Sequence, residues 1–331
     1  MFTQPELMTG TNAYRATSAA LPQRLSARRG GYVERTIITS DGVRIAVRDY
    51  GSTGAREHTI VLLHGLCLTQ ESWTSQVRHL TRRWGDRVRI ITYDHRGHGE
   101  STGADMRTYR IDRLGADLAD VLTALRVSGP VTLAGHSMGG MTALAYLSRP
   151  AADRPVEPQG LILIATAAGR LAERGIGRLL STRATEMVFE LVHHLPRKAV
   201  DKAANGLVRP LCDGLTKYAG ASWKGAAALT ASAVRTTPLA TAAGFLPGLK
   251  RYDEYGVLSS ITANTIVISG GADLATPVAH ARDMVAAIPG AAHLHRPDAG
   301  HMLLQEHPQC VNGAIDRILE MQTDSTLGAA S

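Results

Sequence analysis

The fold of this chain is decided by one stretch, Val131-Thr132-Leu133-Ala134-Gly135-His136-Ser137-Met138-Gly139-Gly140. Residues 130–134 are apolar or β-branched and predict a buried strand, and residues 138–147 predict a helix. A Gly-x-Ser-x-Gly run between a strand and a helix is typical of a sharp turn that lifts the serine hydroxyl above a sheet. The glycines leave room for neighbouring backbone, and the helix dipole favours developing negative charge. We therefore predict that Ser137 is a nucleophile.

Short apolar runs and helical stretches alternate on both sides of this turn. Residues 32–39 and 43–50 flank the turn signal Ser40-Asp41-Gly42 and predict a hairpin. Further strands are expected at 59–63, 88–92, 161–165, 265–269 and 292–295, and helices at 114–126 and 311–321. This alternation predicts an α/β fold, with a mostly parallel sheet flanked by helices.

Residues 170–250 interrupt the alternation. They contain Ala-rich helical stretches at 184–193 and 226–234 and no convincing strand, which predicts a helical cap inserted into the sheet protein. The expected division is a flexible basic tail (1–31), a core (32–169 and 251–322), the cap (170–250) and a C-terminal tail (323–331).

A serine hydroxyl needs a base, and the base needs an acid that orients it. His301 lies on a loop before the last predicted helix, and Asp273 comes just after the strand at 265–269. Both would project from the carboxyl edge of the sheet, where parallel sheets place their ligands. The chain order Ser137, Asp273, His301 is that of Gly-x-Ser-x-Gly hydrolases. The competing acids are Asp253, Asp283 and Asp298.

An oxyanion requires two preorganised N–H donors. We expect one from the backbone of Met138, and the other from Leu66 or, as the alternative, Cys67, because the predicted strand 59–63 runs into His64-Gly65. His64 is interpreted as a structural residue of this loop. Cys67 is expected to line the pocket as a small apolar side chain, with a reactive thiol left open.

Other side chains carry weaker predictions. The run 93–101, Tyr-Asp-His-Arg-Gly-His-Gly-Glu-Ser, is interpreted as a turn held by internal hydrogen bonds, because its His-x-x-His spacing alone is weak evidence for zinc. His193 and His194 are interpreted as partly exposed helix residues. No metal site is expected. The candidate substrate contacts are Cys67, His136, Phe189, Tyr218 and Trp223.

The sequence resembles the α/β-hydrolase superfamily in the order of its motifs. These are the strand before His64-Gly65, the run 93–99, the run 135–140, Asp273 and His301. The resemblance covers 32–169 and 251–322 and points to its capped esterase, lipase and carbon–carbon hydrolase members. It implies Ser137 as nucleophile, His301 as base and acid, and Asp273 as the acid that orients it. A serine nucleophile argues against epoxide hydrolases and haloalkane dehalogenases, and His-Gly-Leu argues against the hormone-sensitive-lipase-like group.

The resemblance leads to a hypothesis of a serine hydrolase that cleaves a carboxylic ester through an acyl-enzyme, with no cofactor. The alternatives are a carbon–carbon bond hydrolase or thioesterase with the same triad, and a cofactor-free perhydrolase of haloperoxidase-like activity. The alternative outside the enzymes is a hydrolase-fold protein that binds a ligand without turning it over.

Composition excludes several classes. The 331 residues are 44% hydrophobic, carry a net charge of +7, and include no apolar run of about 20 residues that could span a bilayer. The charge is +3 in 1–31, +7 in 170–250 and −3 elsewhere, and no aromatic-interleaved groove accompanies it, which disfavours nucleic acid. An anionic or lipid-like acyl substrate is the sharper hypothesis. Lacking a signal sequence and a disulfide framework, the chain is expected to be cytoplasmic.

Overall fold

The computed structural model describes residues 24–29, 31–51, 56–196, 198–200 and 237–329. Its strands are β1 (Arg24–Arg29), β2 (Tyr32–Ile38), β3 (Arg44–Tyr50), β4 (His58–Leu63), β5 (Val88–Tyr93), β6 (Val131–His136), β7 (Gly160–Ile164), β8 (Asn264–Gly270) and β9 (Ala292–Arg296). Within these residues they form one sheet in the order β1-β2-β3-β5-β4-β6-β7-β8-β9. The pairs from β1 to β5 are antiparallel, and those from β5 through β4 to β9 are parallel. The predicted hairpin and mostly parallel sheet are confirmed.

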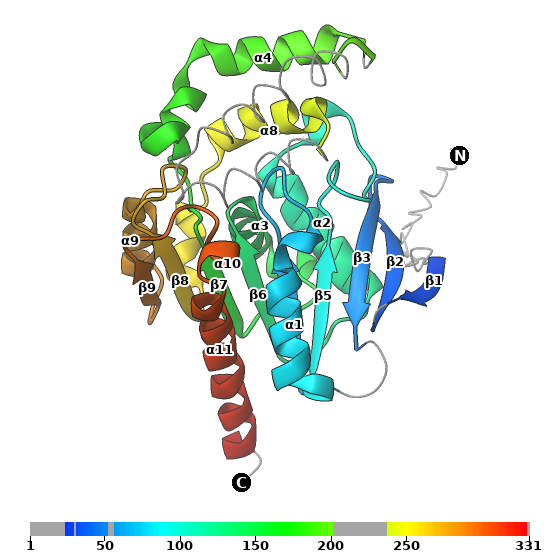
Figure 1. Cartoon of the computed structure of the whole chain (residues 1–331), viewed down its shortest axis with the longest axis vertical. Helices are drawn as coiled ribbons and strands as arrows, with labels where there is room; N and C mark the ends of the chain where they lie inside the picture. Colours follow the sequence, from blue (N-terminus) through cyan, green and yellow to red (C-terminus); the bar gives the residue numbers. More distant parts are fainter. Residues whose placement is uncertain (1–23, 30, 52–55, 197, 201–236, 330–331) are drawn as a thin grey trace, which may run out of the picture.

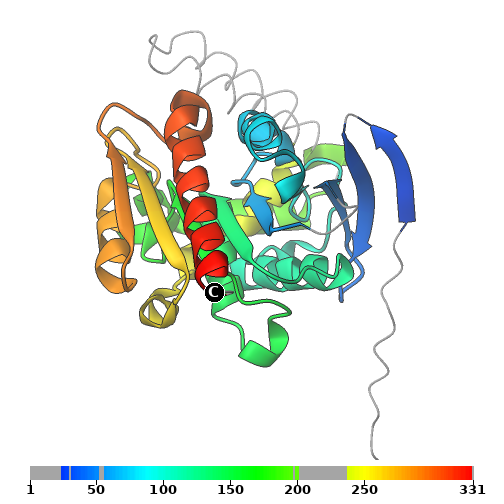
Figure 2. The same ribbon diagram turned by 90° about the horizontal axis from the view of Figure 1, so that it is seen from below.

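Helices cover both faces of the sheet (Figures 1 and 2). The α-helices in the described residues are α1 (Thr74–Arg83), α2 (Ile111–Ala124), α3 (Met138–Leu147), α4 (Arg183–His194), α8 (Leu239–Arg251), α9 (Val278–Ala287), α10 (Leu303–Glu306) and α11 (Pro308–Ala329), and all except α4 and α8 pack on the faces of the sheet (Figure 1). Val61 belongs to the apolar cluster under α2, α3 and α9, and Ile60 to the one under α1, α10 and α11. Because neighbouring strand residues point to opposite faces and both faces are covered, β4 is buried throughout and is apolar from Ile60 to Leu63.

Short 3-10 helices occupy several connections: η1 (Gln70–Trp73), η2 (Gly85–Arg87), η3 (Met106–Thr108), η4 (Ala151–Asp153), η5 (Leu171–Glu173), η6 (Gly175–Ser181) and η9 (Tyr255–Ser260). None of the helices in the described ranges is both long and apolar enough to cross a membrane.

The central strand β4 sets the geometry of the carboxyl edge of the sheet. Leu63, its last residue, is paired with Tyr93 of β5 on one side and with Gly135 of β6 on the other. The segments that follow these three strands therefore leave the sheet side by side, at the edge where parallel sheets place ligands.

Helices α4 and α8 belong to the insertion between β7 and β8 and lie beyond this edge (Figure 1). The helix expected at 184–193 is confirmed as α4, whereas the helix expected at 226–234 lies outside the described residues. Phe245 of α8 is fully buried, with its ring 5.1 Å from that of Tyr109. The division into core and cap stays a prediction.

Two described segments within the expected tails form regular structure. Residues 24–29, which belong to the expected basic tail (1–31), form β1, which pairs with β2. Their sequence lacks apolar alternation, so the partner strand specifies this element. The C-terminal tail was expected from 323, but α11 continues to Ala329. Its last turns extend a helix already nucleated upstream, and such extension needs no apolar pattern of its own.

Candidate active site

Ser137 lies on the turn between β6 and α3, in a strained backbone conformation with φ 52° and ψ −118°. Positive φ is uncommon for a residue with a side chain. The turn is held on both sides: the Ser137 N–H donates to the carbonyl of Ile164 (2.9 Å), and its carbonyl accepts from the Thr166 hydroxyl (2.7 Å). Strain maintained by such contacts is typical of functional sites.

The two flanking glycines are required by contacts with backbone. A Cβ on Gly135 would lie 2.4 Å from the backbone of Gly139, and a Cβ on Gly139 would lie 2.1 Å from the carbonyl oxygen of Leu63. Neither position can therefore accept a side chain. The spacing of the Gly-x-Ser-x-Gly run thus follows from the close approach of α3 to β4 and β6.

The structure brings the three predicted triad residues together. The Nε2 atom of His301 lies 3.0 Å from the Oγ atom of Ser137, and its Nδ1–H donates to the carboxylate of Asp273 at 2.9 Å. Asp273 follows β8, His301 follows β9, and Ser137 follows β6. The sheet therefore brings together Ser137 and His301, which are 164 positions apart in the sequence. The His301 side chain is 27% exposed and that of Asp273 is buried.

The surroundings of Asp273 stabilise its ionised form. Its oxygens accept hydrogen bonds from the N–H groups of Ala275 (2.8 Å) and Thr276 (2.9 Å) and from the Thr276 hydroxyl (2.7 Å). Burial by itself raises the pKa of Asp273, but the charge and hydrogen bond of His301 and the bonds from Thr276 outweigh it, so this pKa lies below its ordinary value. Asp298 is exposed and lies 3.5 Å from His307 instead.

The two expected oxyanion donors have free amides. In the described part of the chain, neither the N–H of Leu66 nor that of Met138 donates to a protein acceptor. The alternative donor, Cys67, is engaged: its N–H donates to Nε2 of His98 at 3.1 Å. A Cβ built on Gly65 would lie 3.2 Å from Cβ of Ser137, so this loop packs directly against the nucleophile turn.

Cys67 and His136 differ in how the structure bears on their expected roles. Burial raises the pKa of the Cys67 thiol to about 12, which argues against a reactive thiolate. His136 was expected to contact substrate, but it is fully buried and its Nε2–H donates to the carbonyl of His301 at 2.8 Å. That expectation is wrong because the ring turns beneath the loop of His301, away from any open surface.

Phe189 on α4 is half-buried and lines a cavity of about 420 Å³ between α4, α8 and η3. The other two expected pocket residues, Tyr218 and Trp223, lie outside the described residues.

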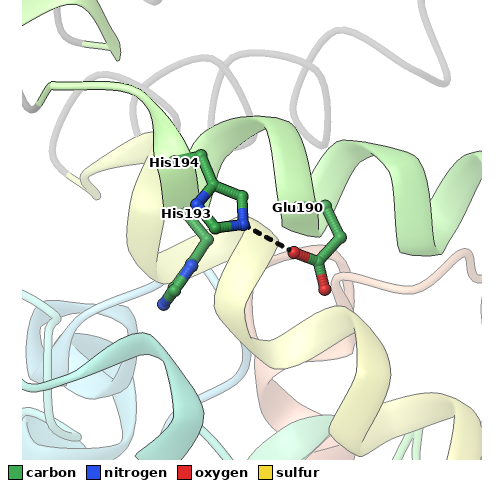
Figure 3. Close-up of side chains that lie close together, drawn as sticks. All are labelled: Glu190, His193 and His194. Carbon is green, nitrogen blue, oxygen red and sulfur yellow. Dashed lines mark ion pairs between the residues drawn. The ribbon is translucent and has the colours of Figure 1, made fainter.

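Glu190, His193 and His194 lie close together on α4, with possible metal-ligating atoms within 4.8 Å of one another (Figure 3). His194 pairs with Glu190 at 3.2 Å, and the ring of His193 stacks on that of Phe189. His194 is exposed and His193 partly buried, as expected for helix residues. The prediction of no metal site remains a prediction.

The run 93–101 is a turn held by internal bonds, as predicted. Within the run, the Asp94 carboxylate accepts from the N–H of Glu100 (2.9 Å) and its carbonyl from the Ser101 hydroxyl (2.6 Å). Two contacts with other segments add to these: Asp94 accepts from the N–H of Gln70 (2.8 Å), and Arg96 is buried against Asp117 at 2.6 Å. This turn contacts the loop after β4 (residues 64–69, called the oxyanion loop after its expected role) through His98, and the sequence did not predict that contact. The one feature of the sequence that could have indicated this contact is that the two segments follow predicted strands, 59–63 and 88–92, that would be neighbours in a parallel sheet.

Comparisons with known proteins agree with this architecture. The family model described as "alpha/beta hydrolase fold" matches residues 58–308. A mouse sn-1-specific diacylglycerol lipase, ABHD11, is 26% identical over 78% of this chain and 80% of its own. The polyketide synthase ThaQ of Burkholderia thailandensis is 29% identical over 84% of this chain, which spans only 12% of that protein.

Among solved structures, a thermophilic esterase from Thermogutta terrifontis is 25% identical, with a TM-score of 0.65 over 87% of this chain and 98% of its own. The family model alone covers more than half of the chain, including the segments that carry Ser137, Asp273 and His301. The chain is therefore a member of the α/β-hydrolase family.

Proposed function

We propose that this protein is a serine hydrolase that cleaves a carboxylic ester through an acyl-enzyme intermediate. The observation that carries the proposal is the continuous chain of hydrogen bonds from Ser137 through His301 to Asp273, at 3.0 and 2.9 Å. A nucleophile, a base in contact with it and a buried acid that orients the base are the parts that acyl transfer requires.

In the proposed mechanism, His301 accepts the Ser137 proton while the hydroxyl oxygen attacks the ester carbonyl carbon. The N–H groups of Leu66 and Met138 donate to the oxyanion that forms. His301 then gives its proton to the departing alcohol, and the acyl-enzyme remains. A water molecule deprotonated by His301 releases the acid and restores Ser137. Asp273 holds the imidazole in the tautomer with hydrogen on Nδ1 and stabilises its protonated form.

An ester is favoured over other acyl compounds by the relatives. The diacylglycerol lipase matches most of this chain, and the Thermogutta protein of similar structure is an esterase. A thioesterase, a carbon–carbon bond hydrolase and a perhydrolase would use the same triad, so the substrate distinguishes them. A ligand-binding protein without turnover would need no aligned base.

The acyl-enzyme is tested with a fluorophosphonate probe and intact-mass measurement. We expect one adduct on the wild-type protein and none on Ser137→Ala, because only an activated serine reacts. No adduct, or an adduct that persists in Ser137→Ala, contradicts the proposal.

The substrate class is tested by comparing kcat/KM for p-nitrophenyl esters of increasing chain length, an acyl-thioester and a ring-fission dienone. An esterase prefers the esters. A preference for the dienone or the thioester by orders of magnitude in kcat/KM assigns the protein to one of the alternatives.

A further inference from the structure

We propose that His64 and His98 are positioning residues that hold the two peptide groups on either side of Leu66, so that the Leu66 N–H faces the developing oxyanion. The inference rests on the proposed function, because it concerns the donor to that oxyanion. Both imidazoles are fully buried, and neither has a part in the proton transfers between Ser137 and His301.

The first peptide group joins Gly65 to Leu66. Its carbonyl oxygen accepts from the Nδ1–H of His64 at 2.8 Å and from the N–H of Leu68 at 3.1 Å. In a trans peptide the carbonyl and the N–H point in opposite directions, and the described chain has no cis peptide bond. Fixing the oxygen on one side of the loop therefore directs the Leu66 N–H to the other.

The second peptide group joins Leu66 to Cys67. Its N–H donates to Nε2 of His98 at 3.1 Å. Cys67 has φ 58°, a left-handed conformation that is disfavoured for a residue with a Cβ. The bond to His98 therefore holds the loop in a conformation that its own backbone preference does not supply.

The two imidazoles are themselves anchored in the turn after β5. Nε2 of His64 accepts from the N–H of His95 at 2.9 Å, and Nδ1–H of His98 donates to the carbonyl of Arg96 at 3.1 Å. The guanidinium of Arg96 is buried in an ion pair with Asp117 at 2.6 Å. The turn after β5, which the ion pair of Arg96 with Asp117 holds in place, is thus linked to the oxyanion loop through the side chains of His64 and His98.

Both positions require a neutral imidazole with its proton on Nδ1, because each Nε2 accepts a backbone N–H. Burial lowers the pKa of His64 to about 4 and that of His98 to about 3, which keeps both rings neutral near pH 7. A lysine or arginine at either position would present only donors to the amide that it faces.

The test compares His98→Asn with His98→Gln. The Asn side chain reaches the position of Nδ1 but not that of Nε2, so the Cys67 N–H loses its acceptor, whereas the Gln oxygen can replace Nε2. The matched control is His58→Asn, which makes the same change in a buried histidine at the opposite end of β4, where the ring contacts Thr323 at 3.1 Å.

The measurements are kcat and KM for p-nitrophenyl acetate and the affinity for a trifluoromethyl ketone, which forms an oxyanion on the serine. For His98→Asn we expect kcat to fall at least about tenfold with KM nearly unchanged, and inhibitor affinity to fall in proportion to kcat/KM. His98→Gln should recover most of the loss, and His58→Asn should keep the wild-type kcat.

Three results overturn the inference. They are a folded His98→Asn variant with wild-type kcat and inhibitor affinity, a loss in His58→Asn as large as in His98→Asn, or a kcat loss without weaker inhibitor binding. If His98→Asn does not fold, His64→Asn, which can still donate to Gly65, and His64→Leu, which cannot, form an independent pair with the same expectation. An inactive wild-type protein overturns the proposed function as well, whereas an active wild type with unaffected variants overturns only the positioning roles.

Discussion

Acidification from pH 7 to pH 5 is expected to destabilise the folded protein by about 2 kcal/mol for each of three histidines, His64, His98 and His136. All three are fully buried. Burial, the largest cause, lowers the pKa of His64 to about 4 and the pKa of each of the other two to about 3. In His64 and His98 the Nε2 atom also accepts a backbone N–H, which requires an unprotonated nitrogen. The hydrogen bond that each of the three rings donates to a backbone carbonyl raises its pKa, but burial outweighs it.

The sign and size follow from proton binding. An unfolded histidine has a pKa of about 6.5, so below that pH the unfolded chain binds protons that the folded protein does not. The stability is therefore fully present above about pH 6.5 and decreases as the pH falls toward the folded pKa. At pH 5, about 1.5 units below the unfolded value, each ring costs about 2 kcal/mol. Three rings together approach the whole stability of a typical domain, about 5–15 kcal/mol.

The assay is urea unfolding, followed by circular dichroism, at pH 7 and pH 5. Buried Asp94 and Asp117 have raised pKa values, because burial disfavours their charge, and they act in the opposite direction. The informative quantity is therefore the difference between proteins. His98→Gln should lose about 2 kcal/mol less than the wild type over this interval, and His194→Gln, on the exposed side of α4, should lose as much as the wild type. A His98→Gln variant with the wild-type pH dependence would refute the reasoning.

Three further predictions concern the site, the turn and the cap. Asp273→Asn should stay folded and lower kcat by a factor of about 10⁴, measured by ester hydrolysis, while Asp298→Asn should keep wild-type turnover; the reverse pattern would assign the orienting role to Asp298. Gly139→Ala should lower the free energy of unfolding in urea by at least about 3 kcal/mol, because the new Cβ would meet a backbone carbonyl of β4. Gly313→Ala, in open space on α11, should raise it by about 1 kcal/mol, and equal effects of the two substitutions would contradict the close approach at Gly139. If the net charge of +7 in residues 170–250 attracts acidic acyl groups, KM for an anionic ester should rise with salt while KM for a neutral ester stays constant; equal salt responses would leave the charge without a role in binding.

Local signals explain why so much of the site could be predicted. The turn around Ser137 has a sequence pattern of its own, because its glycines are required by contacts within a few residues and with the adjacent strand. The strand β4 is continuously apolar from Ile60 to Leu63 because both of its faces are covered. Once these strands are assigned to a parallel sheet, their carboxyl ends must meet at one edge, which is why Asp273 and His301 could be expected beside Ser137.

The mistaken and missed features share a different origin. Whether His136 faces the substrate or the underside of the His301 loop depends on how a loop folds back over β6. The pairing of residues 24–29 with β2 depends on an available strand edge rather than on their own composition. Such features depend on partners that are far away in the sequence, and local sequence patterns do not indicate them.

The amino-acid sequence by itself determined the fold class and the sharp turn at Ser137, because both rest on local backbone requirements and on apolar patterning, and it predicted the order Ser137, Asp273, His301 along the carboxyl edge of the sheet. Only the tertiary structure shows that the N–H of Cys67 is engaged while that of Leu66 donates to no acceptor among the described residues, and that His301 contacts Asp273 rather than Asp298. The physical reason is the register of the sheet. Pairing Leu63 with both Tyr93 and Gly135 places the turn after β5 against the oxyanion loop, so that His98 occupies one amide and leaves the other free.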